Sequence, residues 1–395
     1  MHIPSQPKAA RGGEESSMDK LNWVTRACGI FLLWATAAIA LPAQTTGDGP
    51  PAPIFTLLYS FGMTGDGASP YAGLAQGTDG NFYGTTFIGG AYGSYGTVFK
   101  ITPRGKLTTL HSFDGTDGDQ PAGLVLAIDG NFYGTTEFGG ANSNGTVFKI
   151  TSSGALTTLH SFDRTDGAGP YDAGLVQATD GNFYGTTYQG GADDYGTVFK
   201  ITPRGKLTTL HSFSNADGSF PRAGLVQGTD GNFYGTTQEG GAVGSCGDGC
   251  GTVFRITPGG TLTTLHSFDL TDGEYPLAGL VQGTNGTFYG TADCGGAYGP
   301  GCGPYYPGTV FSLSVGLGPF VETLPAFGKV GTPVHILGTN LTGTTSVTFD
   351  GTPATFTVVS KTLIFTNVPA GATTGTAQVV TPGGTLSSNV PFTVN

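Results

Sequence analysis

Four histidines stand at one recurring position of this 395-residue sequence, and imidazole is a common metal ligand and acid–base group. Each follows Leu-Thr-Thr-Leu; they are His111, His160, His211 and His266. The four rings therefore belong to four different copies of a repeat. Equivalent positions of separate copies are spread along an array and cannot converge within the roughly 2 Å that metal–nitrogen bonds require. We expect no metal centre and no cofactor.

Carboxylates recur too, and carboxylate pairs roughly 5–10 Å apart carry out glycoside hydrolysis. One set lies in Asp-Gly turns, where an aspartate caps its own turn; these are Asp79, Asp129, Asp180 and Asp230. The innermost predicted strands, Ala-Gly-Leu-Val-Gln-Gly-Thr, carry no carboxylate. There is no nucleophile elbow and no phosphate-binding loop. Catalysis would have to use loop residues, so an enzyme is the second interpretation.

Loop aspartates and tyrosines are the candidate ligand-binding residues, because loops on a rigid scaffold are where binding residues collect. A tyrosine ring can stack on a sugar while an aspartate accepts hydroxyl hydrogen bonds. The candidates are Asp117, Asp166, Asp217 and Asp272 between repeats, and Tyr92, Tyr95, Asp193 and Tyr195 in other long loops. The alternative is that the aspartates cap their own turns.

Five copies of one repeat must position these residues. Asp-Gly-Asn-Phe-Tyr-Gly-Thr-Thr starts at residues 79, 129, 180 and 230, and returns in degraded form at 285. The third copy predicts four strands, over 173–179, 182–187, 196–202 and 207–213. Four antiparallel strands per period are typical of a β-propeller blade. The Phe-Tyr pair sends one ring to each face of a blade, so aromatic rings should fill the space between blades.

The ends of the repeat region predict how it closes. It opens with an unpaired fourth strand within residues 54–61 and ends with a third strand, 308–314, that has no successor. We expect these two strands to pair and to remove two exposed edges. The predicted fold is all-β: a five-bladed β-propeller over residues 54–314, closed by an N-terminal strand.

The first 43 residues have the pattern of a signal peptide. Lys20 and Arg26 precede the apolar run Ala27–Leu41, which is too short for a membrane span, and small residues follow. Met18 is a more suitable start for this segment than the first residue. Residues 44–53 then form a linker. We expect an exported protein, secreted or at the cell surface, without a membrane span after processing.

Composition excludes several classes of protein. Glycine accounts for 70 residues and aromatic side chains for 11% of the chain, which fits a turn-rich β protein and neither a disordered chain nor collagen. Residues 1–43 hold three of the 27 acidic and four of the 16 basic residues, so the exported chain carries a net charge of −12. Such a surface repels phosphate backbones, and we expect no nucleic-acid partner. We expect a monomer.

Four cysteines remain after export, all in the long second-to-third-strand loops of the fourth and fifth repeats. An oxidising compartment favours disulfides, so we predict Cys246–Cys250 and Cys294–Cys302. A bond between the two loops, Cys250–Cys294, is the rival, and a four-cysteine zinc site is a third alternative.

Residues 319–395 differ from the repeats and follow a glycine-rich linker at 315–318. Short alternating runs separated by Gly, Pro, Asn and Asp predict a small β-sandwich. The predicted strands cover 334–337, 346–349, 354–359, 362–366, 377–380 and 390–394.

The third repeat, GLVQATDGNFYGTTYQGG followed by YGTVFKITPRGKLTTLHSF, resembles the Gloeo/Verruco (GloVer) tandem repeat of exported bacterial proteins. All five copies share this resemblance, which implies a secreted or surface-attached bacterial protein and brings no catalytic residues. The segment PAFGKVGTPVHILGTNLTGTTSVTFDGTPATF is similar to an IPT/TIG domain, an Ig-like fold that implies spacing or adhesion.

Together these patterns predict an exported, non-catalytic binding or adhesion protein for an extracellular or envelope polysaccharide. The alternatives are a polysaccharide hydrolase or lyase that uses loop carboxylates, and a purely structural surface protein. We expect binding on the face built from the inter-repeat links and the second-to-third-strand loops, because the opposite face has only short, similar turns. Several weak sites on similar blades would raise avidity for a polymer by about 10² or more.

Overall fold

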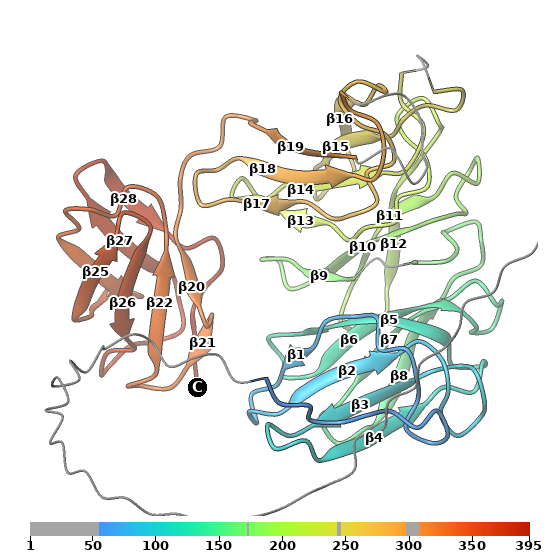
Figure 1. Cartoon of the computed structure of the whole chain (residues 1–395), viewed down its shortest axis with the longest axis horizontal. Helices are drawn as coiled ribbons and strands as arrows, with labels where there is room; N and C mark the ends of the chain where they lie inside the picture. Colours follow the sequence, from blue (N-terminus) through green and yellow to red (C-terminus); the bar gives the residue numbers. More distant parts are fainter. Residues whose placement is uncertain (1–54, 172–173, 243–245, 298–307) are drawn as a thin grey trace, which may run out of the picture. The chain divides into compact units, whose positions relative to one another are not determined.

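The computed structural model describes residues 55–171, 174–242, 246–297 and 308–395, and every regular element within them is a β-strand (Figure 1). The predicted signal peptide, the linker at 44–53 and Cys302 lie outside these residues. No helix in the described part of the chain is long and apolar enough to cross a membrane.

The repeats form successive antiparallel sheets, coloured from blue to orange along the chain in Figure 1. The first contains β1 (Ala75–Gln76), β2 (Phe82–Thr86), β3 (Thr97–Ile101) and β4 (Leu107–Ser112). The second contains β5 (Asp119–Leu126), β6 (Phe132–Phe138), β7 (Thr146–Ile150) and β8 (Leu156–Ser161). The third contains β9 (Val176–Gln177), β10 (Phe183–Thr187), β11 (Thr197–Ile201) and β12 (Leu207–Ser212). The fourth contains β13 (Val226–Gln227), β14 (Phe233–Thr237), β15 (Thr252–Ile256) and β16 (Leu262–Ser267). The four predicted strands are confirmed in these four copies, although most first strands are shorter than expected.

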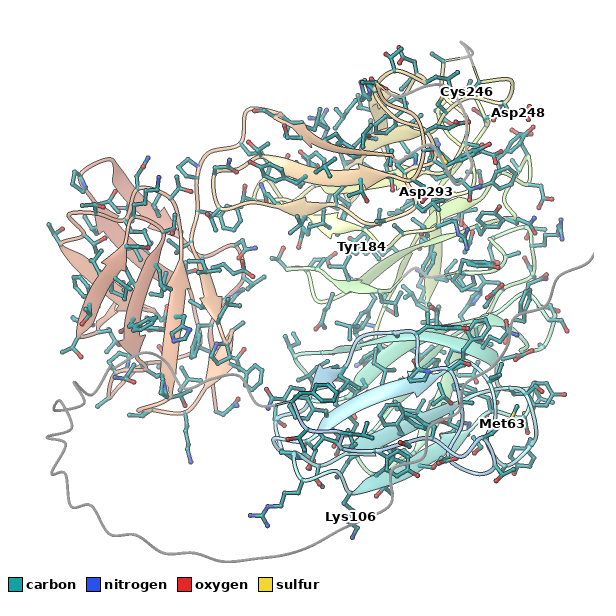
Figure 2. The ribbon with its side chains drawn as sticks, viewed as in Figure 1. Met63, Lys106, Tyr184, Cys246, Asp248 and Asp293 are labelled. Atoms are coloured by element: carbon teal, nitrogen blue, oxygen red, sulfur yellow. A yellow bond between two sulfur atoms is a disulfide. The ribbon has the colours of Figure 1, made fainter. Side chains whose placement is uncertain are left out.

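Aromatic rings pack between consecutive sheets, as predicted from the Phe-Tyr pair. The tyrosine of each second strand stacks on the phenylalanine of the next sheet, with ring centroids 3.9–4.1 Å apart. Tyr184 of β10, labelled in Figure 2, stacks in this way on Phe233 of β14. All four tyrosines are fully buried. Burial of aromatic surface therefore holds each sheet to its neighbour.

The Asp-Gly turn between the first two strands also ties the third strand to the second. The Asp79 carboxylate accepts hydrogen bonds from Asn81, from the Tyr83 hydroxyl at 2.8 Å and from Lys100 Nζ at 3.2 Å. Burial alone would raise the pKa of Asp79, but these donors outweigh it and bring the pKa to about 2. Asp129 has the same kind of partners and also a pKa of about 2. The turn function predicted for these aspartates is confirmed.

We expect the melting temperature to fall as the pH drops from about 4 to about 2. The pKa values of Asp79 and Asp129 are depressed in the folded state, to about 2 from an ordinary 3.8. Their contribution to stability is therefore present above pH 3.8 and is lost as the pH falls through the folded-state pKa. Melting curves of wild type and Asp79→Asn/Asp129→Asn from pH 7 to 2 measure this. The variant should have a lower melting temperature at pH 7, and its melting temperature should fall less between pH 4 and pH 2. Equal falls for the variant and the wild type would contradict this prediction.

The fifth sheet has three strands: β17 (Val281–Gln282), β18 (Phe288–Ala292) and β19 (Thr309–Leu313). In the described part of the chain β19 pairs with β18 alone, and residues 55–61 belong to no sheet. The expected pairing of 54–61 with 308–314 is thus not seen, and neither closure nor the number of blades is confirmed.

The C-terminal region, red in Figure 1, contains two four-stranded sheets. One has the order β20 (Glu322–Leu324), β22 (Pro333–Leu337), β26 (Leu363–Asn367), β25 (Phe356–Ser360). The other has the order β24 (Thr352–Pro353), β23 (Ser346–Phe349), β27 (Ala377–Thr381), β28 (Gly384–Ser387). The short strands β21 (Phe327–Gly328) and β29 (Thr393–Val394) pair in parallel. Buried side chains of both sheets, such as Ile336 and Val347, share one core, as expected of a β-sandwich.

Cys246 and Cys250 form a disulfide with Cα atoms 5.4 Å apart, which confirms the first predicted bond. This bond excludes the rival pairing of Cys250 with Cys294. Cys294 is itself disulfide-bonded. Because Cys302 lies outside the described residues, the Cys294–Cys302 bond stays a prediction.

Candidate binding site

The four inter-repeat aspartates are bound inside their own turns. Each carboxylate forms a hydrogen bond with the histidine at the end of the preceding strand. The Nε2–Oδ2 distances are 2.6 Å for His111–Asp117, 2.7 Å for His160–Asp166, and 2.8 Å for His211–Asp217 and His266–Asp272. The second carboxylate oxygen of Asp117 accepts the Asp114 amide at 3.1 Å. This is the turn-capping arrangement. Among the described residues no three His, Cys, Asp or Glu side chains form a metal-binding group.

Asp217 is the inter-repeat aspartate whose acidity is perturbed. Burial works to raise the pKa of Asp217, but hydrogen bonds from His211 and Ser214 outweigh it and lower the pKa overall. Its carboxylate is therefore ionised at neutral pH and has both oxygens engaged. A ligand role for the inter-repeat aspartates stays a prediction and would have to compete with these bonds.

The other four candidates do not meet in one place. Tyr92 is 63% exposed, and Asp193 is exposed as well. Tyr95 is half-buried and packs against Gly115. Tyr195 is half-buried, with its ring centroid 5.8 Å from that of Phe220. Two of the four side chains thus help to pack the repeats, and none of the four lines the cavity described next.

A cavity of about 230 Å³ lies at the inter-repeat links of the first three repeats. Its walls are Tyr71, Ala72, Phe87, Gln120, Pro121, Ala122, Gly123, Glu137 and Tyr171. Three of these side chains are aromatic, one is a carboxylate and one is an amide. The cavity therefore combines apolar ring surface with a few polar groups, as ligand sites generally do.

Equivalent positions of different repeats supply these walls. Phe87 directly follows β2, and Glu137 occupies the same place in the second repeat, near the end of β6. Tyr71 and Tyr171 each follow the proline of their link. Glu137 is 3% exposed and Tyr71 is 77% exposed, so the carboxylate lies at depth and the ring at the rim. The Tyr71 and Phe87 rings are 5.2 Å apart.

The backbone of the links is unusual at one repeated position. The residue before each link proline has a positive φ, which is 57° at Gln120, 56° at Phe220 and 55° at Tyr275. Left-handed backbone at such non-glycine residues costs energy, and it occurs mainly where the surrounding structure enforces it. At Gln120 this backbone conformation fixes the direction of the side chain, which lines the cavity.

Aromatic and cationic side chains continue beyond Tyr171. Its ring lies 5.4 Å from that of Tyr188, which is 5.0 Å from Phe220. The Arg222 guanidinium stands 4.5 Å above the Tyr171 ring, within the range of a cation–π contact. Burial and the charge of Glu239 raise the pKa of Tyr188, with Arg222 opposing them, so its hydroxyl is protonated at neutral pH. The result is a row of rings leading away from the cavity.

Two glutamates of the fourth and fifth repeats have perturbed acidity. Burial raises the pKa of Glu239, and the charge of Asp248 adds to the rise. Burial also raises the pKa of Glu274, with a further contribution from Glu239. A carboxyl group with a raised pKa can serve as a general acid, which is the chemistry that the hydrolase alternative needs.

The cavity residues were not among the sequence candidates. Within the repeat, the position after Phe-Tyr-Gly-Thr-Thr and the positions around the link proline vary, while their neighbours are nearly constant. The first of these holds Phe87, Glu137, Tyr188, Gln238 and Asp293 in turn. This variation among otherwise similar repeats was the signal available in the sequence. Residues of a binding surface can differ from repeat to repeat, whereas residues of the core are nearly constant.

Comparison with known proteins finds one matching repeat family and several solved structures of low sequence identity. The family described as Gloeobacter/Verrucomicrobia repeat matches residues 49–246 and 172–359. A gluconolactonase from Xanthomonas campestris is 13% identical, with 77% of this chain and 88% of that chain covered and a TM-score of 0.38. A luciferin-regenerating enzyme is 11% identical, with 62% and 77% covered and a TM-score of 0.40. A protein of unknown function from Dyadobacter fermentans is 11% identical, with 76% and 94% covered and a TM-score of 0.39. No curated protein matches.

Proposed function

Because this chain belongs to the Gloeobacter/Verrucomicrobia repeat family and carries an aromatic-lined cavity, we propose that it is an exported, non-catalytic protein that binds an extracellular or envelope polysaccharide. In this proposal the signal peptide over residues 1–43 directs export. The repeat sheets are the blades of a β-propeller, and residues 319–395 form an Ig-like IPT/TIG domain that spaces or anchors them.

The composition of the cavity carries the proposal. Tyr71, Phe87 and Tyr171 offer ring faces on which the apolar face of a sugar can stack. Glu137 and Gln120 add carboxylate and amide oxygens that accept hydrogen bonds from sugar hydroxyls. The volume of about 230 Å³ is below that of pockets for drug-sized ligands, roughly 300–1,000 Å³, so it suits one sugar unit of a chain.

The row of rings supports a polymer over a free sugar. Tyr188 and Phe220 extend the aromatic surface from Tyr171 into the fourth repeat. A chain that places one unit in the cavity can lay further units along these rings. Each additional contact is then made within a bound complex, which raises avidity without strong single contacts.

Binding fits the cavity better than hydrolysis does. Glycoside hydrolysis needs two carboxyl groups flanking the scissile bond, and Glu137 is the one carboxylate that lines this cavity. The hydrolase or lyase remains the second candidate because burial raises the pKa of both Glu239 and Glu274. Its active site would be on the fourth and fifth repeats.

Affinity electrophoresis in native gels that contain neutral or acidic polysaccharides tests the proposal. We expect a polymer that retards the wild type and retards Tyr71→Ala/Tyr171→Ala much less, by about 5- to 150-fold in apparent affinity for two stacking rings. Tyr92→Ala is the matched control, because Tyr92 is exposed but outside the cavity. Equal retardation of all three proteins would contradict the cavity as the site. Release of reducing sugar that Glu239→Gln or Glu274→Gln abolishes would establish the hydrolase instead.

A further inference from the structure

The two ends of the repeat array carry complementary parts of one sheet. Residues 56–61 contact the first sheet as a preceding fourth strand would. A Cβ added to Gly105 would meet the Leu58 carbonyl oxygen at 2.5 Å, and the equivalent Gly154 would meet that of Leu110, in β4, at 2.7 Å. Phe61 packs edge-on to Phe99 at 5.1 Å, as Phe113 packs on Phe148 at 5.3 Å.

The turn that follows this segment is also that of a fourth strand. The Tyr59 hydroxyl donates to Asp66 Oδ2 at 2.7 Å, at the repeat position where His111 contacts Asp117. The Gly62 amide donates to the same Asp66 oxygen at 2.9 Å, much as the Asp114 amide donates to Asp117. In these contacts residues 56–61 match the fourth strands of the other repeats, but no neighbouring strand pairs with them in the described part of the chain.

Among the residues that the structure describes, the fifth sheet lacks a fourth strand and leaves exposed part of the face that other repeats bury. Val310 is 81% exposed, whereas the equivalent valines of the four earlier sheets are at most 1% exposed. Tyr289 is 37% exposed, whereas its four equivalents are fully buried under the phenylalanine of the next sheet. The face that every earlier repeat buries against its successor is thus exposed at these two residues, and within the described residues β19 pairs with β18 alone.

We propose that residues 56–61 pair with β19 of the same chain and complete the fifth sheet, so that the first sheet covers Tyr289 and Val310. The register follows from the other sheets, where Lys200 faces Thr208 and Phe199 faces Thr209. Ser312 should then face Thr56, and Phe311 should face Leu57. Tyr289 should stack on Phe82 as Tyr83 stacks on Phe132.

The same chain is the favoured partner for two reasons. Each chain has one surplus strand and one incomplete sheet, so pairing within the chain satisfies both, whereas head-to-tail pairing between copies gives a ring of several chains or an open filament. Strands tethered in one chain also meet at an effective concentration in the millimolar range, far above that of a dilute second copy.

An engineered disulfide tests this pairing in the full exported chain. Thr56→Cys/Ser312→Cys places two thiols on facing positions, where Cα atoms should be within the roughly 4.4–6.8 Å that a disulfide spans. Lys200→Cys/Thr208→Cys is the matched control, because those residues face each other in the third sheet. After oxidation, non-reducing peptide mapping of the monomer fraction should find the 56–312 link as fully formed as the control link.

Two outcomes would overturn the proposal: a 56–312 link found only between two chains, or no link where the control link forms. Hydrogen exchange on the wild type provides a measurement that needs no substitution. Amides of 309–313 should be protected to the same degree as those of 97–101; rapid exchange at 309–313 alone would also overturn it. Neither experiment depends on polysaccharide binding, so its outcome leaves the proposed function to its own test.

Discussion

Replacing Tyr184 by alanine should lower the free energy of unfolding by about 3–5 kcal/mol, as for other large-to-small changes of buried aromatic residues. Tyr184 is fully buried, and its ring centroid is 3.9 Å from that of Phe233 in the next sheet. Its hydroxyl donates to Asp180 at 2.9 Å. Alanine removes the stack, leaves a cavity between two sheets and removes one of the hydrogen bonds to the Asp180 carboxylate, which keeps Asn182 and Lys200 as donors. Urea unfolding at neutral pH measures the loss.

Two further variants show which interactions of Tyr184 account for the loss in unfolding free energy. Tyr184→Phe keeps the ring and loses only the hydroxyl, so it should cost about 1 kcal/mol. Tyr289→Ala changes the same repeat position in the fifth sheet, where the ring is uncovered. If the array closes as proposed, Tyr289→Ala should cost nearly as much as Tyr184→Ala. A cost below about 1 kcal/mol for Tyr184→Ala would contradict the role assigned to the stacked rings.

Gly196→Ala should destabilise the protein by about 3 kcal/mol or more, whereas Gly181→Ala should cost about 1–2 kcal/mol. Both glycines have a positive φ, 95° at Gly196 and 78° at Gly181, so both substitutions strain the backbone. A Cβ at Gly196 would also meet the Thr187 carbonyl oxygen at 2.4 Å, and one at Gly181 would meet nothing within 4 Å. The difference between the two variants therefore measures the close approach of β10 to the start of β11.

Thermal and urea unfolding of both variants give that difference directly. A circular dichroism spectrum at 20 °C first shows that each variant is folded, and only folded variants are compared. Equal losses for Gly196→Ala and Gly181→Ala would show that conformational strain alone accounts for the glycine requirement, and would contradict the contact with Thr187.

The strands of the repeat were predictable because each of their signals is local. Alternating apolar residues, an Asp-Gly turn and a Pro-Arg-Gly turn fix the third copy without reference to the rest of the chain. The second strand was predicted over 182–187 and β10 covers Phe183–Thr187. The first strand was predicted over 173–179, but β9 contains only Val176–Gln177. Its glycine- and alanine-rich residues have little side chain to pack, so the ladder is short.

The cavity was not predictable in the same way, because it depends on how three links meet. The position before the link proline is left-handed in Gln120, Phe220 and Tyr275, although none of these residues prefers that conformation. Tyrosines such as Tyr95 and Tyr71 look alike in sequence, yet one packs against Gly115 and the other stands at the rim of the cavity. Tertiary packing alone separates the two roles.

The most direct test of polysaccharide binding is titration calorimetry with an oligosaccharide from the polymer that the protein retains. The wild type should bind, and Tyr71→Ala/Tyr171→Ala should bind about 5- to 150-fold more weakly, with a melting temperature within a few degrees of the wild type's. Phe365→Ala, which removes an exposed ring stacked on His335 in the C-terminal sheets, should bind like the wild type. Undiminished affinity in Tyr71→Ala/Tyr171→Ala together with loss of binding in Phe365→Ala would place the site in the C-terminal region and contradict the proposal.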